Sequence, residues 1–546
     1  MLRCFLQSFS LNYVSEFNQT DSKPRNKMTK RRIPPPANSL TYSRRHFIHS
    51  CAACSTCLAT VPLMTMNACS EQKKMRLRIV YSLHDVVQPR PDWPNVGFDF
   101  EPVMARINTT LVERCQDFEF IPTLATGPED AEKILLQDKD SDIGGYIVFQ
   151  MNCWNRVVQT IAASGKPVLY ADFQYAGSGG FLVYTAKFLR EESDNFGFVA
   201  SSDMDDLVKA VNKFNIIRRG GTNADFVAKT KRVRQKRTPS PADMSFIQDD
   251  LTTLSPEDCL RQMKSSRILA VRDENSAPSE PIMNIPMEYV SFLVLNEAWK
   301  RADKDQSRSI AERWQSKATE VQDVSFETLE NSAAMYLGMK EVLKTYDANA
   351  ISVNCLGGFY GGHIHAYPCL GFHELNNEGM VGACECDVRS TATMVAFTAM
   401  TGGRPGYISD PVIDTAKRQI IYAHCVASSK VFGPDGVENP FSIMTHSEDR
   451  QGASLRSIMP VGYLTTTLEI APQRKEILFH QAKAVDNDPD DRACRTKLCA
   501  EPVGDIEKLF SEWDEWGWHR VTFYGDLKEP AYALADAIGW KIKEEA

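Results

Sequence analysis

The chain has 546 residues, which is too many for one hydrophobic core, so we expect two to four domains. Its 43% hydrophobic and 24% charged residues are typical of an ordinary globular protein, but its net charge of -8 is unevenly divided. Residues 1–69 hold nine basic and two acidic residues, whereas the remainder holds 53 basic and 68 acidic residues, a net charge of -15. An acidic body argues against a nucleic-acid partner, which needs a basic surface, and suits a neutral small molecule or a cation.

Residues 1–69 are interpreted as an export leader. Arg44-Arg45, followed by Phe47-Ile48 and a short apolar stretch, resembles a twin-arginine signal. Cys69, which follows the small residue Ala68, resembles the site at which lipoproteins are processed and lipidated. The sequence therefore predicts export by the twin-arginine route to a periplasmic or membrane-anchored location, with a cytoplasmic location as the alternative.

Residues 75–222 alternate short apolar runs with amphipathic stretches. The runs include "LRIVYSL", "DIGGYIVFQM" and "KPVLYAD", and helix-like segments such as "EDAEKILLQ" separate them. Strands that alternate with helices indicate βαβ units around a parallel sheet, so this region is predicted to be a flavodoxin-like domain. The basic run from Lys229 to Arg237 is interpreted as a solvated helix end or a linker.

Residues 223–412 are predicted to form a second α/β domain of the flavodoxin or Rossmann type. Residues 326–346 place apolar side chains on one helical face, with Ser325 as the N-cap, and "ANAISVNCL" is typical of a buried strand. Residues 413–546 differ, because strand-like runs such as "SIMPVGYLTTTLEIA" and "HRVTFYGD" follow one another with little helix between them. This last part is predicted to be a mainly β, barrel-like domain.

The segment "MVGACECDV" carries two cysteines and two carboxylates in four consecutive residues. If residues 380–385 form a strand, Cys384 and Cys386 point to one face and Glu385 to the other. The helix expected in "DVRSTATMVAFTAMTGG" makes Asp387 its N-cap rather than a catalytic group, and Gly402-Gly403 its stop signal. Glu385 then lies where a strand ends and a helix begins, the edge at which ligands bind in open α/β sheets.

Two further polar residues end short apolar runs, Asp410 in "RPGYISDP" and His424 in "QIIYAH". The strand–helix–strand pattern predicts that Glu385 and Asp410 emerge from the same edge of one parallel sheet. Two carboxylates and an imidazole suit a divalent cation such as manganese, magnesium or cobalt. The alternatives are solvated loop acids above a packed histidine, or a thiolate zinc site made by Cys384, Cys386 and Cys425.

The ordered motifs "NCL", "YPCL", "ACECDV", "TGGRPGYISD", "AHC" and "HRVTFYGD" resemble the L-fucose isomerase and L-arabinose isomerase superfamily between Val353 and Gly525. The resemblance implies a divalent metal, most commonly Mn²⁺, held by Glu385, Asp410 and His519. His424 matches a histidine that is a ligand in the arabinose branch. The family also implies a homo-oligomer in which one subunit's N-terminal domain helps to line a neighbour's site.

The implied activity is aldose–ketose isomerisation of a pentose, hexose or deoxyhexose through an enediol. That reaction needs a base that moves a proton between C1 and C2, and a cation that polarises the carbonyl, so Glu385 and Asp410 are the predicted catalytic residues. The alternative function is an exported, non-catalytic carbohydrate-binding protein on the same fold. His363 and His365 in "GGHIHAYPC" are interpreted as residues of an alternating strand or loop rather than as substrate contacts.

Overall fold

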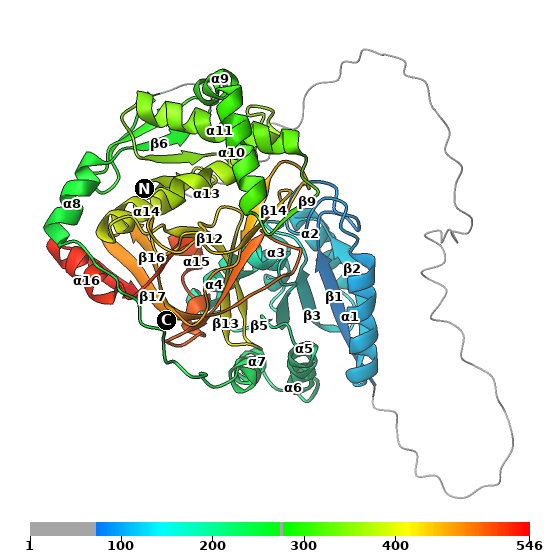
Figure 1. The fold of residues 1–546 in the computed structure, drawn as a ribbon. Helices are drawn as coiled ribbons and strands as arrows, with labels where there is room; N and C mark the ends of the chain where they lie inside the picture. Colours follow the sequence, from blue (N-terminus) through cyan, green and yellow to red (C-terminus); the bar gives the residue numbers. More distant parts are fainter. Residues whose placement is uncertain (1–72, 274–276) are drawn as a thin grey trace, which may run out of the picture. The chain divides into compact units, whose positions relative to one another are not determined.

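The computed structural model describes residues 73–273 and 277–546, and this part of the chain contains three large sheets and one small sheet (Figure 1). The predicted leader, with Arg44, Arg45 and Cys69, lies outside the described residues. Within the described ranges, no helix is both long enough and apolar enough to cross a membrane.

The first sheet has five parallel strands in the order β2-β1-β3-β4-β5, which is the flavodoxin-like order. Its two central strands are buried along most of their length, as expected for a parallel sheet covered by helices on both faces. The strands are β1 (Met75–Ser82), β2 (Phe118–Ala125), β3 (Ile143–Gln150), β4 (Val168–Asp172) and β5 (Phe196–Val199). The helices of this region are α1 (Glu101–Arg114), α2 (Pro128–Asp138), α3 (Val157–Ala162), α4 (Ser178–Arg190), α5 (Met204–Val211), α6 (Asn215–Arg218) and α7 (Asn223–Arg237), with a 3₁₀ turn at Asn212–Phe214.

Helix α7 packs on the first sheet, because Thr230 lies against Gly197 of β5. The composition of the basic run at its end predicts a solvated helix end or linker. In the structure this run is only partly solvated. Arg234 is 6% exposed, donates to the Phe198 carbonyl at 3.1 Å and forms a bidentate ion pair with Glu507. A single arginine in such a run can be buried when a carboxylate lies opposite and forms a bidentate ion pair with it. Composition alone does not reveal that partner.

The second sheet has the order β11-β10-β6-β8-β7 and is parallel except for the β7–β8 pair. Two helix predictions are confirmed: α11 begins after Ser325, whose hydroxyl accepts from the Thr328 N–H, and α14 begins after Asp387. The strands are β6 (Ile268–Val271), β7 (Ala277–Pro278), β8 (Met287–Val290), β10 (Ala350–Val353) and β11 (Val381–Ala383). The helices are α8 (Pro256–Ser265), α9 (Phe292–Arg301), α10 (Lys304–Lys317), α11 (Phe326–Thr345), α12 (Cys355–Tyr360), α13 (Cys369–Asn377) and α14 (Val388–Met400).

The third sheet closes on itself, which confirms the predicted barrel-like C-terminal domain. Strand β16 pairs with both β19 and β17, so six antiparallel strands form a ring in the order β16-β19-β12-β13-β18-β17, and β20 joins β17 from outside. The strands are β12 (Tyr407–Asp414), β13 (Gln419–His424), β16 (Leu464–Ala471), β17 (Glu476–Asn487), β18 (Thr496–Pro502), β19 (Arg520–Tyr524) and β20 (Lys541–Glu544). The small sheet is β9 (Glu320–Gln322), β14 (Phe441–Met444) and β15 (Ser454–Ser457), and the last helices are α15 (Trp513–Trp516) and α16 (Lys528–Ala537), with a 3₁₀ turn at Lys508–Phe510.

Strand β12 corrects one prediction. It does not join Glu385's parallel sheet; it pairs antiparallel with β13 and β19, so Glu385 and Asp410 come from different sheets. The reason is local, because a short turn over residues 415–418 folds β12 back onto β13 as a hairpin. Helix α14 contacts strands of both sheets and so holds the end of β11 against the barrel (Figure 1). The predicted domain boundaries at 222/223 and 412/413 stay predictions.

Candidate metal centre

Glu385, Asp410, His424 and His519 lie together. Each offers one ligand atom, and these four atoms all lie within 4.8 Å of one another. Asp410, His424 and His519 are buried, and the Glu385 side chain is 30% exposed. All four residues predicted from the sequence as metal ligands are therefore brought to one place, although their roles remain predictions.

Glu385 sits in a tight turn that the sequence did not predict. The strand β11 ends at Ala383, and Glu385 and Cys386 both adopt the left-handed backbone conformation, with φ of 59° and 53°. Such a conformation costs a non-glycine residue roughly 1–2 kcal/mol, so the surroundings must hold it. The Cys386 N–H donates to the Val353 carbonyl at 3.1 Å and thereby ties the turn to the end of β10. The predicted alternation of Cys384, Glu385 and Cys386 along a strand is wrong, because the strand stops before these residues.

Asp410 and His519 face each other because their strands are neighbours. Ser409 of β12 pairs with Arg520 of β19, so the next position along the ladder places Asp410 opposite His519. His519 Nε2 lies 3.2 Å from Asp410 Oδ1 and 3.5 Å from Glu385 Oε2. His424, the last residue of β13, completes the group, with its Nε2 at 3.7 Å from an oxygen of each carboxylate.

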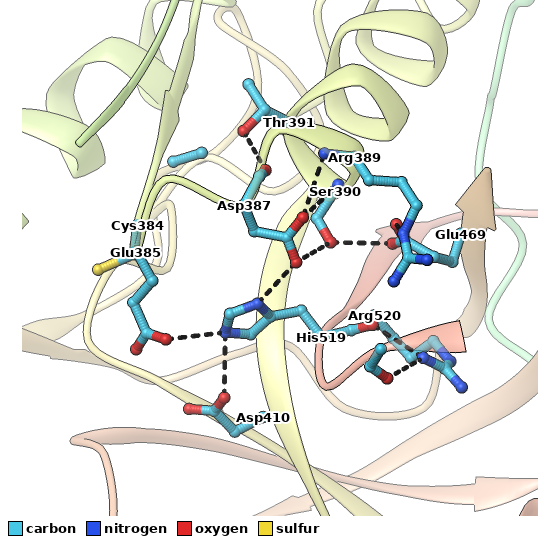
Figure 2. Close-up of polar contacts among 12 residues, drawn as sticks. Cys384, Glu385, Asp387, Arg389, Ser390, Thr391, Asp410, Glu469, His519 and Arg520 are labelled. Atoms are coloured by element: carbon cyan, nitrogen blue, oxygen red, sulfur yellow. Dashed lines mark hydrogen bonds and ion pairs between the residues drawn. The ribbon is translucent and has the colours of Figure 1, made fainter. Parts of the chain in front are cut away.

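Asp387 orients His519 in addition to capping α14. One of its oxygens accepts the backbone N–H groups of Arg389 and Ser390, as predicted for an N-cap, and the other lies 3.0 Å from His519 Nδ1 (Figure 2). A proton on Nδ1 leaves the lone pair of Nε2 facing Glu385 and Asp410. This carboxylate–histidine arrangement is the one that orients histidine ligands in metal sites. Nothing in the sequence indicates this second role, since the two residues are 132 positions apart.

Opposite charges dominate the electrostatics of the cluster. Burial acts to lower the pKa of His519, but Asp387 and Asp410 outweigh it and hold this pKa well above its usual value. Burial acts to raise the pKa of Glu385, but His424 and His519 outweigh it and lower this pKa. Glu385 therefore stays ionised and attracts positive charge, either as protons on the imidazoles or as a metal cation.

The donor set fits a divalent cation. Two carboxylates and two imidazoles are ligands for hard or borderline divalent ions such as manganese or cobalt. Asp410 Oδ1 and His519 Nε2 are buried and make no hydrogen bond, although they approach each other as an ion pair. Buried polar atoms are normally paired, so these two atoms point to an additional partner. Among the described residues, no cysteine belongs to a group of three or more clustered ligand atoms, which disfavours the thiolate zinc alternative.

Glu448 is a carboxyl group that the sequence did not single out. It lies between β14 and β15 and accepts the Tyr360 hydroxyl at 3.0 Å, and its backbone carbonyl accepts the Val96 N–H at 2.8 Å. Burial raises its pKa to about 8, against the effect of His446, and the charges of Asp92 and Glu385 act in the same direction as burial. A carboxyl group with such a pKa is a potential proton donor at neutral pH.

The other sequence candidates lie outside the cluster. His363 and His365 are exposed residues of the loop between α12 and α13, as predicted, and the His363 ring stacks on Phe292 at 5.4 Å. Neither histidine belongs to the four-residue group.

Comparisons with known proteins point to sugar isomerases. No family model matches the chain. The sulfoquinovose isomerase of Priestia megaterium is 27% identical over 224 residues, which are 40% of this chain and 48% of that protein. The sulfoquinovose isomerase of a Clostridium species is 24% identical over 212 residues, 37% of this chain and 46% of that protein. The chain thus spans about half the length of the curated relatives it matches. Among solved structures, a XylFII molecule is matched at 12% identity with a TM-score of 0.15, a value too low to indicate a shared fold.

Proposed function

We propose that this protein is a metal-dependent aldose–ketose isomerase whose centre is the cluster Glu385, Asp410, His424 and His519. The observation that carries the proposal is the meeting of these four ligand atoms from two different sheets within 4.8 Å. The similarity to sulfoquinovose isomerases supports the same reaction class.

The residues have the chemistry that the reaction needs. A bound divalent cation supplies polarisation of the sugar carbonyl and of the neighbouring hydroxyl. The two carboxylates would hold the cation, and a carboxylate at this place would serve as the base that takes a proton from C2 and returns it at C1 of the enediol. Asp387 favours the tautomer of His519 that carries its proton on Nδ1, so that the lone pair of Nε2 faces the cluster. Burial raises the pKa of Glu448 to about 8, so this carboxyl group would be able to give a proton to a sugar oxygen that reaches it.

The proposed substrate is an aldose whose identity is open. Pentoses, hexoses and deoxyhexoses follow from the resemblance to fucose and arabinose isomerases. The names of the relatives add a hexose that carries a sulfonate at C6.

We further propose that the protein is a homo-oligomer, exported by the twin-arginine route and lipidated at Cys69. Retention of an Arg44→Lys/Arg45→Lys variant in the cytoplasm would support the route, and unchanged export would contradict it.

The test is metal analysis of the purified protein after reconstitution with Mn²⁺. Wild type is expected to hold close to one Mn²⁺ per chain, whereas Glu385→Gln and Asp410→Asn lose it. The matched control is Asp414→Asn, because Asp414 is a buried carboxylate on the same strand that bonds Ser202 instead. A wild type without bound metal, or variants that keep it, would contradict the proposal.

The second candidate is an exported carbohydrate-binding protein without catalytic activity. The participation of His519 disfavours it, because a sugar cleft between two α/β lobes needs no ligand from a barrel domain. An aldose panel that includes a sulfonated hexose, scored by ketose formation with Mn²⁺ present, separates the two. Binding of a sugar without any ketose would favour the second candidate.

A further inference from the structure

Cys355 and Cys384 bring two buried thiols into contact beside the metal centre. Their sulfur atoms lie 3.0 Å apart, about 1 Å more than a disulfide bond of about 2.05 Å. Both cysteines are free, and they are 2% and 6% exposed. Such a pair forms a bond with small movements, unlike cysteines whose side chains point apart.

The backbone fixes this approach. Cys355 follows β10 and Cys384 follows β11, and these strands are paired in register, with Ser352 opposite Ala383. The Ser352 hydroxyl lies 3.3 Å from the Ala383 carbonyl and 3.4 Å from the Cys384 carbonyl. The two thiols therefore meet because parallel strands end together, and not through a chance contact of flexible loops.

We propose that Cys355 and Cys384 are a site of reversible disulfide formation that weakens metal binding at Glu385. The step balances as thiol–disulfide exchange: the two thiols give two electrons and two protons to a small-molecule disulfide, which leaves as two thiols, and the Cys355–Cys384 bond forms. The bond itself does not depend on the isomerase proposal, whereas its effect on the metal rests on the proposed function.

Glu385 transmits the change because it follows Cys384 directly (Figure 2). Its backbone N–H faces the Cys355 sulfur, and its own conformation is left-handed with φ of 59°. Drawing the sulfurs together by about 1 Å moves the turn that presents Glu385 to the cluster and Asp387 to His519. A strained turn has few conformations available, so the displacement is passed to these side chains and is not absorbed by the backbone.

The experiment compares full-length protein treated with dithiothreitol and with oxidised glutathione. Digestion with a glutamyl endopeptidase, which cuts after Glu374, Glu378 and Glu385, isolates Cys384 in the peptide 379–385. That peptide is expected to be linked to the one that contains Cys355, with a mass about 2 Da below the sum of the two reduced peptides, since one hydrogen leaves each thiol. Cys369 shares the latter peptide, so a Cys369→Ser variant must keep the link, while Cys355→Ser and Cys384→Ser must each lose it.

Titration with Mn²⁺ then measures the coupling. The oxidised protein is expected to bind at least about tenfold more weakly, the size of effect seen when groups that orient a metal ligand are disturbed. Dithiothreitol is expected to restore the affinity, and Cys384→Ser is expected to show the same affinity under both conditions. No link between the two peptides would overturn the site. A link with unchanged Mn²⁺ affinity would overturn the coupling. A reduced protein that binds no Mn²⁺ would instead refute the proposed function and leave the mapped disulfide standing.

Discussion

The carboxylate of Asp387 is shared between the first turn of α14 and the ring of His519. Its Oδ1 accepts two backbone N–H groups, and its Oδ2 lies 3.0 Å from His519 Nδ1 (Figure 2). The start of a helix in one domain thereby sets the orientation of a histidine in the barrel. The same residue stabilises the helix and prepares the metal centre.

Substituting Asp387 by asparagine separates these two roles. Asparagine is as good an N-cap as aspartate, so Asp387→Asn is expected to leave the helix and the fold intact. The introduced amide donates to His519 Nδ1, however, and favours the tautomer in which Nε2 carries the proton. We expect Mn²⁺ affinity to fall about 10–100-fold, as measured by titration calorimetry.

The control for that variant is Asp303→Asn. Asp303 caps α10 through the Gln306 N–H at 2.8 Å and takes no part in the metal cluster. It should bind Mn²⁺ as wild type does. Equal affinity in Asp387→Asn and Asp303→Asn would show that the contact with His519 has no effect on the metal.

The two histidines of the cluster, His424 and His519, are expected to contribute unequally to Mn²⁺ affinity. His519 Nε2 lies 3.2 Å and 3.5 Å from the two carboxylates and is held by Asp387, whereas His424 Nε2 lies 3.7 Å from both and its buried Nδ1 has no hydrogen-bond partner. His519→Asn should therefore weaken Mn²⁺ binding at least about tenfold more than His424→Asn, because its orientation is fixed in advance. Mn²⁺ titrations followed by electron paramagnetic resonance measure both values. A larger loss in His424→Asn would reverse this assignment.

Part of this centre was predictable from the sequence. Period-2 and helical patterns with cap residues located β10, α11 and α14, and ordered motifs singled out Glu385, Asp410, His424 and His519. The sheet that holds Asp410 was mispredicted, because a strand's residues do not specify whether its partner is the preceding parallel strand or the next strand of a hairpin. The left-handed turn at Glu385 was missed as well, since neither Glu385 nor Cys386 is a residue that favours positive φ. Long-range pairs such as Asp387 with His519 follow only from tertiary packing.

Removal of the metal should destabilise the protein. A ligand that binds only the folded state stabilises it by about 2.7 kcal/mol at a free concentration of 100 times its dissociation constant. Wild type stripped with a chelator should therefore unfold at a lower temperature than the Mn²⁺-loaded protein, as followed by circular dichroism. In Asp410→Asn, added Mn²⁺ should not move the midpoint. A shift of the same size in that variant would place the stabilising ion elsewhere.

Glu545 is expected to govern acid stability from a buried position beside β17 and β19. Its carboxylate is fully buried, pairs with Arg520 and lies 2.9 Å from His480 Nδ1, and Arg520 in turn donates to the His519 carbonyl at 2.9 Å. Burial acts to raise the pKa of Glu545, but Arg520 and His480 outweigh it and lower this pKa to about 2. Because the folded pKa is depressed, the contribution to stability is complete above the unfolded pKa of about 4.3 and is lost as the pH falls toward 2.

The stability lost is roughly 3 kcal/mol, which is the free energy that corresponds to lowering the pKa of Glu545 from about 4.3 to about 2 on folding. Thermal unfolding midpoints of wild type should fall between about pH 4 and pH 2, the range in which the unfolded state has taken up the proton and the folded state has not. Glu545→Gln should be less stable at neutral pH, because Arg520 is left without its charge partner, and its unfolding midpoint should depend less on pH over the same range.

The matched control is Glu501→Gln. Glu501 is another buried carboxylate paired with an arginine, Arg418, but it has no contact with the backbone of a metal ligand. Only Glu545→Gln should also weaken Mn²⁺ binding, because Arg520 positions the carbonyl of His519; equal Mn²⁺ affinity in the two variants would confine Glu545 to a stabilising role.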